Sequence, residues 1–309
     1  FMTSAVQRFL LPRLGGFSVY REGMDRESLK CAVNIVAEGK HPLVIFAEGI
    51  ITRCNDRLVN FMEGPAFIAR SAAKQRKEGK TVIHPVFIRY FFEGDLRAAV
   101  TPVIEEIERR LSWQPQTQLP LRERIGKVGD ALLSLKEMEY FHAKQTGSFR
   151  ERLQRMMDHL LVPLEDHWTA GRHDGDVMAR VKRLRSAILP DMVAGDLADT
   201  ERSARWRHLA DVYLVQQLHC YPGDYFENLT PERILETVER YEEDLTDLAR
   251  PHFPIRAIIT VGDAIEVSAA RERSHDSDPV TTEVRRQLEA MLESSKSLRR
   301  VRPTGTEIS

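Results

Sequence analysis

The sequence predicts an α/β fold: a mixed, mostly parallel sheet flanked by helices, with a large all-helical insertion before the last strand. Apolar strand-like runs alternate with amphipathic helix-like segments over residues 1–95, which is typical of α/β domains. From residue 100 onward the segments are charged and carry apolar residues at helical spacing. A strand-like run returns at 255–261. The expected parts are the first portion of the α/β domain at 1–99, the helical insertion at 100–250, the last strand and helix of the α/β domain at 251–295, and a disordered tail at 296–309.

Three strand-like runs and two long helix-like segments make up the first part. Asp25 predicts the N-cap of the first long helix, because its carboxylate can accept a hydrogen bond from the first turn, and Gly39 predicts its end. Residues 43–46 are all apolar and predict a buried strand. In order, the expected elements are a short helix from Ala5 to about Leu11, a strand at 17–20, a helix between Asp25 and Gly39, a strand at 43–46, a helix at 65–77 and a strand at 82–88.

The insertion is expected to contain a helical hairpin. Apolar stripes begin at Leu121 and at Phe149, the turn lies at 145–147, and Ser148 can cap the second helix. Further helices are expected at 175–188, 202–219 and 231–248, with a capped helix at 280–292 after the last strand. Trp113, Trp168 and Trp206 are expected to pack in the helical core, and no internal repeat of fixed period is visible. Because the run at 255–261 is largely apolar on both faces, it is expected to join the same sheet as residues 43–46.

Composition excludes several classes of function. Lys and Arg total 45 against 46 Asp and Glu, so no global charge attracts nucleic acid, and no nucleic-acid partner is expected. The three cysteines are far apart and form no Cys-x-x-Cys pair, which argues against a disulfide framework or a zinc site. Neither a signal peptide nor an apolar run long enough to span a bilayer is present. No Gly-rich phosphate-loop motif supports a nucleotide-binding enzyme.

The residues that favour a specific chemistry follow the predicted strands. Phe46, Ala47, Glu48 and Gly49 come at the end of the second strand, and Arg53 follows them in the loop. Arg21 comes directly after the first strand, Gly64 opens a helix, and Pro85 lies inside the third strand, where proline is disfavoured unless the chain is at an edge or shapes a site. Because ligands collect at strand ends in open α/β sheets, we expect Glu48, Arg21 and Arg53 to converge on one site.

These blocks resemble the glycerophospholipid acyltransferase family. Its recurring blocks are a His-x4-Asp, a glycine-hydrophobic-Arg strand, a Phe-Pro-Glu-Gly loop and a Val-Pro-Val strand. The last three have counterparts here in Gly16-Phe17-Ser18-Val19-Tyr20-Arg21, in Phe46-Ala47-Glu48-Gly49 with Ala47 in place of Pro, and in Ile83-His84-Pro85-Val86. The turn Val261-Gly262-Asp263-Ala264-Ile265 resembles the one after the family's final strand, so the resemblance covers about 1–95 and 253–295.

The resemblance implies transfer of a fatty acyl group from an acyl thioester, on coenzyme A or a carrier protein, to the hydroxyl of a glycerol phosphate or lysophospholipid. It implies no metal or other cofactor, and a peripheral position at the cytoplasmic face of a membrane. Arg21 and Arg53 would hold the phosphate as bidentate donors, although each could equally be a surface arginine paired with a carboxylate. Where the family often has Thr-Arg-Ser after Glu-Gly, this chain has Ile50-Ile51-Thr52. The acyl chain, the acceptor and the oligomeric state stay open.

The largest departure from the family is that no His-x4-Asp precedes Arg21. A histidine must take the proton of the attacking hydroxyl, and an aspartate must orient it, so the pair is expected upstream of Phe1 and the 309-residue chain alone is expected to transfer no acyl group. The spacing does occur at His219 and Asp224, inside the insertion, where we interpret it as coincidence. His84 is interpreted as a satisfied histidine, either buried or at a sheet edge, rather than a base. The alternative function is a non-catalytic relative that binds lipid or phosphate and uses the helical lobe to bind a partner.

Overall fold

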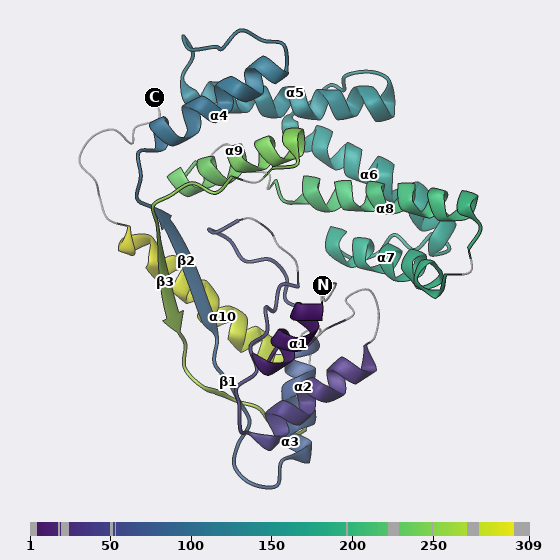
Figure 1. Cartoon of the computed structure of the whole chain (residues 1–309), viewed down its shortest axis with the longest axis vertical. Helices are drawn as coiled ribbons and strands as arrows, with labels where there is room; N and C mark the ends of the chain where they lie inside the picture. Colours follow the sequence, from purple (N-terminus) through teal and green to yellow (C-terminus); the bar gives the residue numbers. More distant parts are fainter. Residues whose placement is uncertain are drawn as a thin grey trace.

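The computed structural model describes residues 5–17, 19, 25–49, 52, 54–195, 197–221, 229–248, 250–270 and 278–299. Of these residues, 61% are helical and 7% lie in strands. The strands form two separate antiparallel pairs, β1 with β4 and β2 with β3. The predicted mostly parallel sheet flanked by helices is therefore wrong, and the described part of the chain is mainly α-helical (Figure 1).

Every helix expected from the sequence is found, with its ends shifted by a few residues. The helices are α1 (Ala5–Arg13), α2 (Arg26–Glu38), α3 (Gly64–Gln75), α4 (Leu96–Arg110), α5 (Leu121–Phe141), α6 (Phe149–Trp168), α7 (Val177–Ala194), α8 (Asp199–His219), α9 (Pro231–Thr246), α10 (Pro279–Ser295) and the 3-10 helix η1 (Lys296–Leu298). The strands are β1 (Val82–Ile83), β2 (Val86–Phe92), β3 (Ile255–Val261) and β4 (Ile265–Glu266). Residues 300–309, which include most of the predicted disordered tail, lie outside the described residues.

The last predicted strand is confirmed as β3, but its partner is not the predicted one. β3 pairs antiparallel with β2, in a register that places Ile259 opposite Ile88. Exposed and partly buried residues alternate along β3, so it is not buried on both faces as the sequence predicted. Figure 1 shows α10 lying behind this two-stranded ribbon, and β2 also contacts α9 of the green helical lobe.

Residues 43–46 do not form a strand, contrary to the prediction. Val44 and Phe46 are 79% and 81% exposed. A strand needs a partner, and the free edge of β2 is already occupied by side chains: Asn55 bonds both the amide and the carbonyl of Tyr90, and Glu232 accepts from the amide of Phe92. The strand expected at 17–20 falls partly on residues outside those described, and Phe17 and Val19 are not in a strand.

The helical lobe has the expected hairpin. Ser148 caps α6 in a reciprocal capping box with Glu151, and apolar residues of α5, α6, α7 and α8 form the larger core. α9 packs with α4 and α5 in a second core. Trp113 and Trp168 pack against these cores as predicted, whereas Trp206 is 59% exposed on α8.

An internal repeat, which the sequence analysis did not find, organises this lobe. Near its C-terminal end each of α4, α5 and α6 carries a buried glutamate that accepts a two-pronged hydrogen bond from an arginine in the first or second turn of the next helix. The pairs are Glu108 with Arg124, Glu137 with Arg152, and Glu165 with Arg180. The N-caps of α5, α6 and α7, at Pro120, Ser148 and Asp176, follow one another at intervals of 28 residues.

The same glutamates also hold the loops between the helices. Glu108 accepts from the amide of Gln116 at 3.0 Å, and Glu137 from the amide of Gln145 at 3.1 Å. In both cases the amide lies eight residues after the glutamate. Glu165 has the eighth residue, His173, as a partner through the imidazole. Each unit therefore consists of a helix and the turn into the next helix, and one buried ion pair connects the two helices.

Candidate functional site

The predicted loop at Phe46-Ala47-Glu48-Gly49 forms a turn that closes on the chain before α3. The amide of Met62 donates to the carbonyl of Ala47 at 2.8 Å, and the amide of Val59 donates to Glu48 Oε1 at 3.1 Å. Gly49 has a φ of +69°, and a Cβ there would lie 3.0 Å from Met62 Cγ. Glu48 thus holds together the two ends of a loop that runs from residue 47 to residue 62.

The far end of this loop, residues 52 and 54–57, lies against α9. Thr52 accepts at its carbonyl from Arg240, and Asp56 forms an ion pair of 2.8 Å with Arg233. The amide of Asn55 donates to Glu236 Oε1 at 3.2 Å. One face of α9 therefore meets the loop that the sequence marked as functional. We call this region the loop–α9 site.

Four arginines from three parts of the chain meet in the loop–α9 site. Arg89 on β2 is 3% exposed and donates to the carbonyl of Asn55. Arg240 on α9 is 1% exposed, and it shares the carbonyl of Cys220 with Arg57, at 3.4 and 3.3 Å. Arg233 completes the group through its ion pair with Asp56. Two guanidinium groups on one carbonyl oxygen lie close together, which concentrates positive charge there.

Three carboxylates lie within electrostatic range of Arg89: Asp56, Glu232 and Glu236. Burial, and next the nearby charge of Asp56, raise the pKa of Glu236 to about 8, so Glu236 is mainly protonated at pH 7. Burial also lowers the pKa of Arg89, which shows how poorly its charge is solvated. The Nε atoms of Arg57 and Arg89 are buried without a hydrogen-bond partner among the described residues. A buried donor without an acceptor is costly, and an anion would supply one.

The structure describes some of the residues that the sequence predicted for the site and not others. Arg21 and Arg53 lie outside the described residues, so their convergence on Glu48 stays a prediction. Gly64 is the first residue of α3, and Pro85 lies between β1 and β2, where its carbonyl accepts from the amide of Gly262 at 2.8 Å. Phe46, whose ring is exposed, lies next to Ala47 at the start of the loop.

The two histidines singled out from the sequence differ in their surroundings. His84 is exposed, and its Nδ1 lies 3.3 Å from the carbonyl of Gly262, in agreement with an edge histidine. Burial, and then the charge of Arg57, lower the pKa of His219, so its neutral form is favoured beside the loop–α9 site. Asp224, the other half of the His-x4-Asp spacing, is outside the described residues.

Sequence analysis missed Arg57, Arg89, Arg233 and Arg240. On α9 a signal was present, because Arg233, Glu236 and Arg240 fall on one helical face by their spacing. Arg89 alternates with Phe87 and Phe91 on the buried face of β2, and a charged residue in such a row is itself unusual. No local pattern connects these residues to the loop, because 177 positions separate Asp56 from its partner Arg233.

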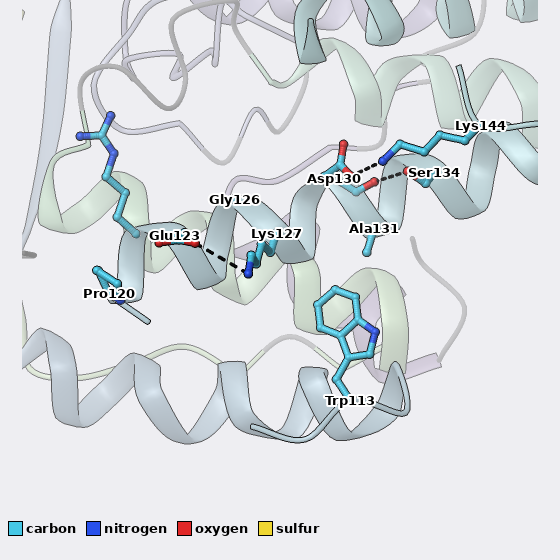
Figure 2. Close-up of a pocket in the computed structure, with 10 residues that line it drawn as sticks. Trp113, Pro120, Glu123, Gly126, Lys127, Asp130, Ala131, Ser134 and Lys144 are labelled. Atoms are coloured by element: carbon cyan, nitrogen blue, oxygen red, sulfur yellow. Dashed lines mark hydrogen bonds and ion pairs between the residues drawn. The ribbon is translucent and has the colours of Figure 1, made fainter. Parts of the chain in front are cut away.

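The helical lobe carries two equivalent surface grooves. The first, of about 920 Å³, lies between α5 and the segment that carries Trp113, with ion pairs of Lys127 to Glu123 and Lys144 to Asp130 on its rim (Figure 2). The second, of about 690 Å³, is lined at positions 28 residues later. The corresponding residues are Trp113 and Phe141, Arg122 and Arg150, Glu123 and Glu151, Gly126 and Gln154, Lys127 and Arg155, and Asp130 and Asp158.

Comparison with protein-family models, with curated proteins and with solved structures finds no match to this chain. Within the ranges that the structure describes, no three His, Cys, Asp or Glu side chains are grouped so as to hold a metal ion. None of the helices in those ranges combines the length and apolar character needed to cross a bilayer.

Proposed function

We propose that the loop–α9 site binds the phosphate of a glycerol phosphate or lysophospholipid, and that the protein acts in acyl transfer to that acceptor from an acyl thioester on coenzyme A or a carrier protein. One observation carries the proposal: Arg89, Arg233 and Arg240 contact residues 52 and 54–57, shortly after the Phe-Ala-Glu-Gly sequence, and this segment contributes a fourth arginine, Arg57. Arginine is suited to this role because its planar fork matches phosphate oxygens. A lysophospholipid acceptor lies in a membrane, so we place the protein peripherally at the cytoplasmic face of that membrane.

In the proposed reaction the acceptor hydroxyl attacks the thioester carbonyl carbon, the carbon–sulfur bond breaks, and the thiol leaves. A base must take the hydroxyl proton, which the leaving thiolate can then receive. The arginines contribute by fixing the phosphate, so that the hydroxyl of the same molecule is held at one place. Arg21 and Arg53 belong to this proposal as further phosphate donors.

Calorimetric titration of the 309-residue chain tests the phosphate site. Glycerol 3-phosphate is expected to bind and glycerol is not, because only the former offers an anion. Arg57→Gln should weaken binding by roughly 10- to 100-fold, the effect of losing a charged hydrogen bond of about 1.5–3 kcal/mol. Arg155→Gln, an exposed arginine of α6, is the matched control. Equal binding of both ligands, or no effect of Arg57→Gln, would refute the site.

Release of free thiol from acyl-coenzyme A in the presence of lysophosphatidate tests the transfer step separately. Because no His-x4-Asp precedes Arg21, we expect the 309-residue chain alone to bind phosphate and to release no thiol. Thiol release that depends on the acceptor and falls in Arg57→Gln would show instead that this chain supplies its own base. Binding of phosphate without binding of acyl-coenzyme A would favour the non-catalytic phosphate-binding relative.

A second function, binding of a partner by the helical lobe, is favoured by the two equivalent grooves. Repeat proteins use successive equivalent surfaces to hold an extended ligand, so one peptide side chain would occupy each groove. A Cβ on Gly126 would meet no atom within 4 Å, so a side chain at this position begins in open space. Gly126→Trp is chosen to fill the first groove, and Gln154→Trp to fill the second. Peptides selected on the wild-type chain from a displayed library should lose binding to both variants. Retention of binding in both would refute this function.

A further inference from the structure

The β2–β3 ribbon exposes one face made only of apolar side chains. On β2 these are Val86, Ile88 and Tyr90, which are 50%, 37% and 46% exposed. On β3 they include Ile259 and Val261, which are 64% and 60% exposed. Register places Val86 opposite Val261 and Ile88 opposite Ile259, so the exposed residues form continuous cross-strand rows. Ile255 and Ala257 extend the face along β3.

The opposite face of the ribbon is already covered. Phe87, Arg89 and Phe91 are buried there, and α10 lies along that side (Figure 1). The charges of the two strands, Arg89 and Arg256, are both on this covered face, and Arg256 is paired with Glu93. A two-stranded ribbon with one bare apolar face is marginal in water, because more strands or a covering layer are needed for stability.

We propose that this face packs against the same face of a second copy of the chain, so that two ribbons form a small two-layer sandwich around a two-fold axis. Two sheets pack in this way when their inner faces are apolar. In an isologous interface the same patch serves both subunits, and a patch without charge is complementary to itself. This inference is independent of the loop–α9 site and of acyl transfer.

The exposed area is compatible with a weak dimer. Taking about 100 Å² of apolar surface for a fully exposed aliphatic side chain and about 200 Å² for Tyr, the exposed fractions give roughly 400 Å² per copy. Two copies would bury roughly 800 Å², and specific interfaces begin near about 1,000 Å². Val82 and Phe253, at the two ends of the ribbon and 45% and 73% exposed, can supply the remainder. The dimer should therefore dissociate on dilution.

A membrane surface fits this face less well than a second copy does. Peripheral proteins combine an apolar patch with basic residues that approach anionic headgroups. Neither strand places a basic side chain on the apolar face, since Arg89 and Arg256 point to the other side. The face therefore favours a neutral, apolar partner surface.

Sedimentation equilibrium of the full chain over about a hundredfold range of concentration tests the proposal. The wild-type mass should rise with concentration from 35.5 kDa toward twice that value. Ile259→Glu should stay at 35.5 kDa throughout, because two buried carboxylates would face each other across the axis. Leu135→Glu is the matched control: Leu135 is 54% exposed on α5, away from the ribbon, and this variant should still dimerise.

Circular dichroism must first show that Ile259→Glu is folded. If it is not, Ile259→Thr keeps the β-branched shape, and it should weaken association at least fivefold. A wild-type mass of 35.5 kDa at every concentration, or equal weakening by Ile259→Glu and Leu135→Glu, would overturn the proposal. So would a monomeric wild type that binds phosphatidylcholine–phosphatidylglycerol vesicles and loses that binding in Ile259→Glu, because the occupant would then be a membrane.

Discussion

Removing one member of a buried repeat ion pair should unfold the helical lobe at much lower denaturant concentration. In Arg152→Met the carboxylate of Glu137, which is fully buried, loses both hydrogen bonds from the guanidinium and keeps only the amide of Gln145. Arg152 also bonds Asp130 and the hydroxyl of Ser134. Leaving one buried charge without its partner costs about 3–5 kcal/mol, so we expect a loss in that range in urea unfolding followed by circular dichroism.

The pH dependence of this loss identifies its cause. Burial acts to raise the pKa of Glu137, but the hydrogen bonds and charge of Arg152 outweigh it, and the pKa lies below the usual value of 4.5. In the wild type this carboxylate therefore stabilises the fold above pH 4.5, and that contribution is lost as pH falls through the lowered folded-state pKa. In Arg152→Met burial prevails and the pKa rises. The stability gap between variant and wild type should then narrow as pH falls toward 4.

Two controls accompany this experiment. Arg155 is an exposed arginine of the same helix that donates to the carbonyl of Thr146, and Arg155→Met should cost less than about 1 kcal/mol. The double variant Glu137→Met with Arg152→Met should be more stable than Arg152→Met alone, because no buried charge remains. A loss below about 1 kcal/mol in Arg152→Met, or a gap that does not change with pH, would refute the reasoning.

Three further predictions concern single positions. In urea unfolding, the stability advantage of Glu236→Gln over the wild type should grow as pH rises from 5 to 9. The reason is that folded Glu236, with its pKa of about 8, keeps a proton that the unfolded chain releases near pH 4.5. A difference that is constant with pH would contradict the raised pKa. Ser148→Ala should lower the free energy of unfolding by about 1 kcal/mol, since it removes the capping box of α6, and an unchanged urea midpoint would contradict this. Gly39→Ala should lower the free energy of unfolding by at least about 1 kcal/mol, because Gly39 has a φ of +67° and a Cβ there would lie 2.6 Å from Arg76 Nη2. A rise in melting temperature would contradict this.

The helices were predictable because their signals are local. Asp25, Ser148 and Gly39 act within one turn of their helices, and the apolar stripes of α5 and α6 need no distant partner to be recognised. The prediction of a strand at 43–46 was wrong because a short apolar run becomes a strand only if the edge of a neighbouring strand is free. The side chains of Asn55 and Glu232 occupy the edge of β2, and no property of residues 43–46 reveals this.

The repeat and the loop–α9 site were missed for a different reason. The repeat is carried by buried Glu–Arg pairs such as Glu137 with Arg152, and not by a pattern of apolar residues. Charged residues are usually exposed, so their positions are given little weight in predicting a core. The arginines of the loop–α9 site are likewise buried charges, brought together by segments far apart in the sequence. In both cases the prediction was wrong because charged residues were expected to lie at the surface and not in the core.

α9 connects the repeat lobe to the loop–α9 site. Arg233, Glu236 and Arg240 face the loop, while Ile234, Val238 and Tyr241 pack in the core formed with α4 and α5. α9 is thus buried on two sides, and the helices of the first repeat unit set the position of its arginines. A core change such as Val238→Ala creates a cavity that α9 must partly fill by moving. Because the phosphate binding that we propose would depend on the direction of each N–H bond, such a shift should weaken it without changing any guanidinium. Packing in the helical lobe therefore affects the positions of the arginines in the loop–α9 site through α9.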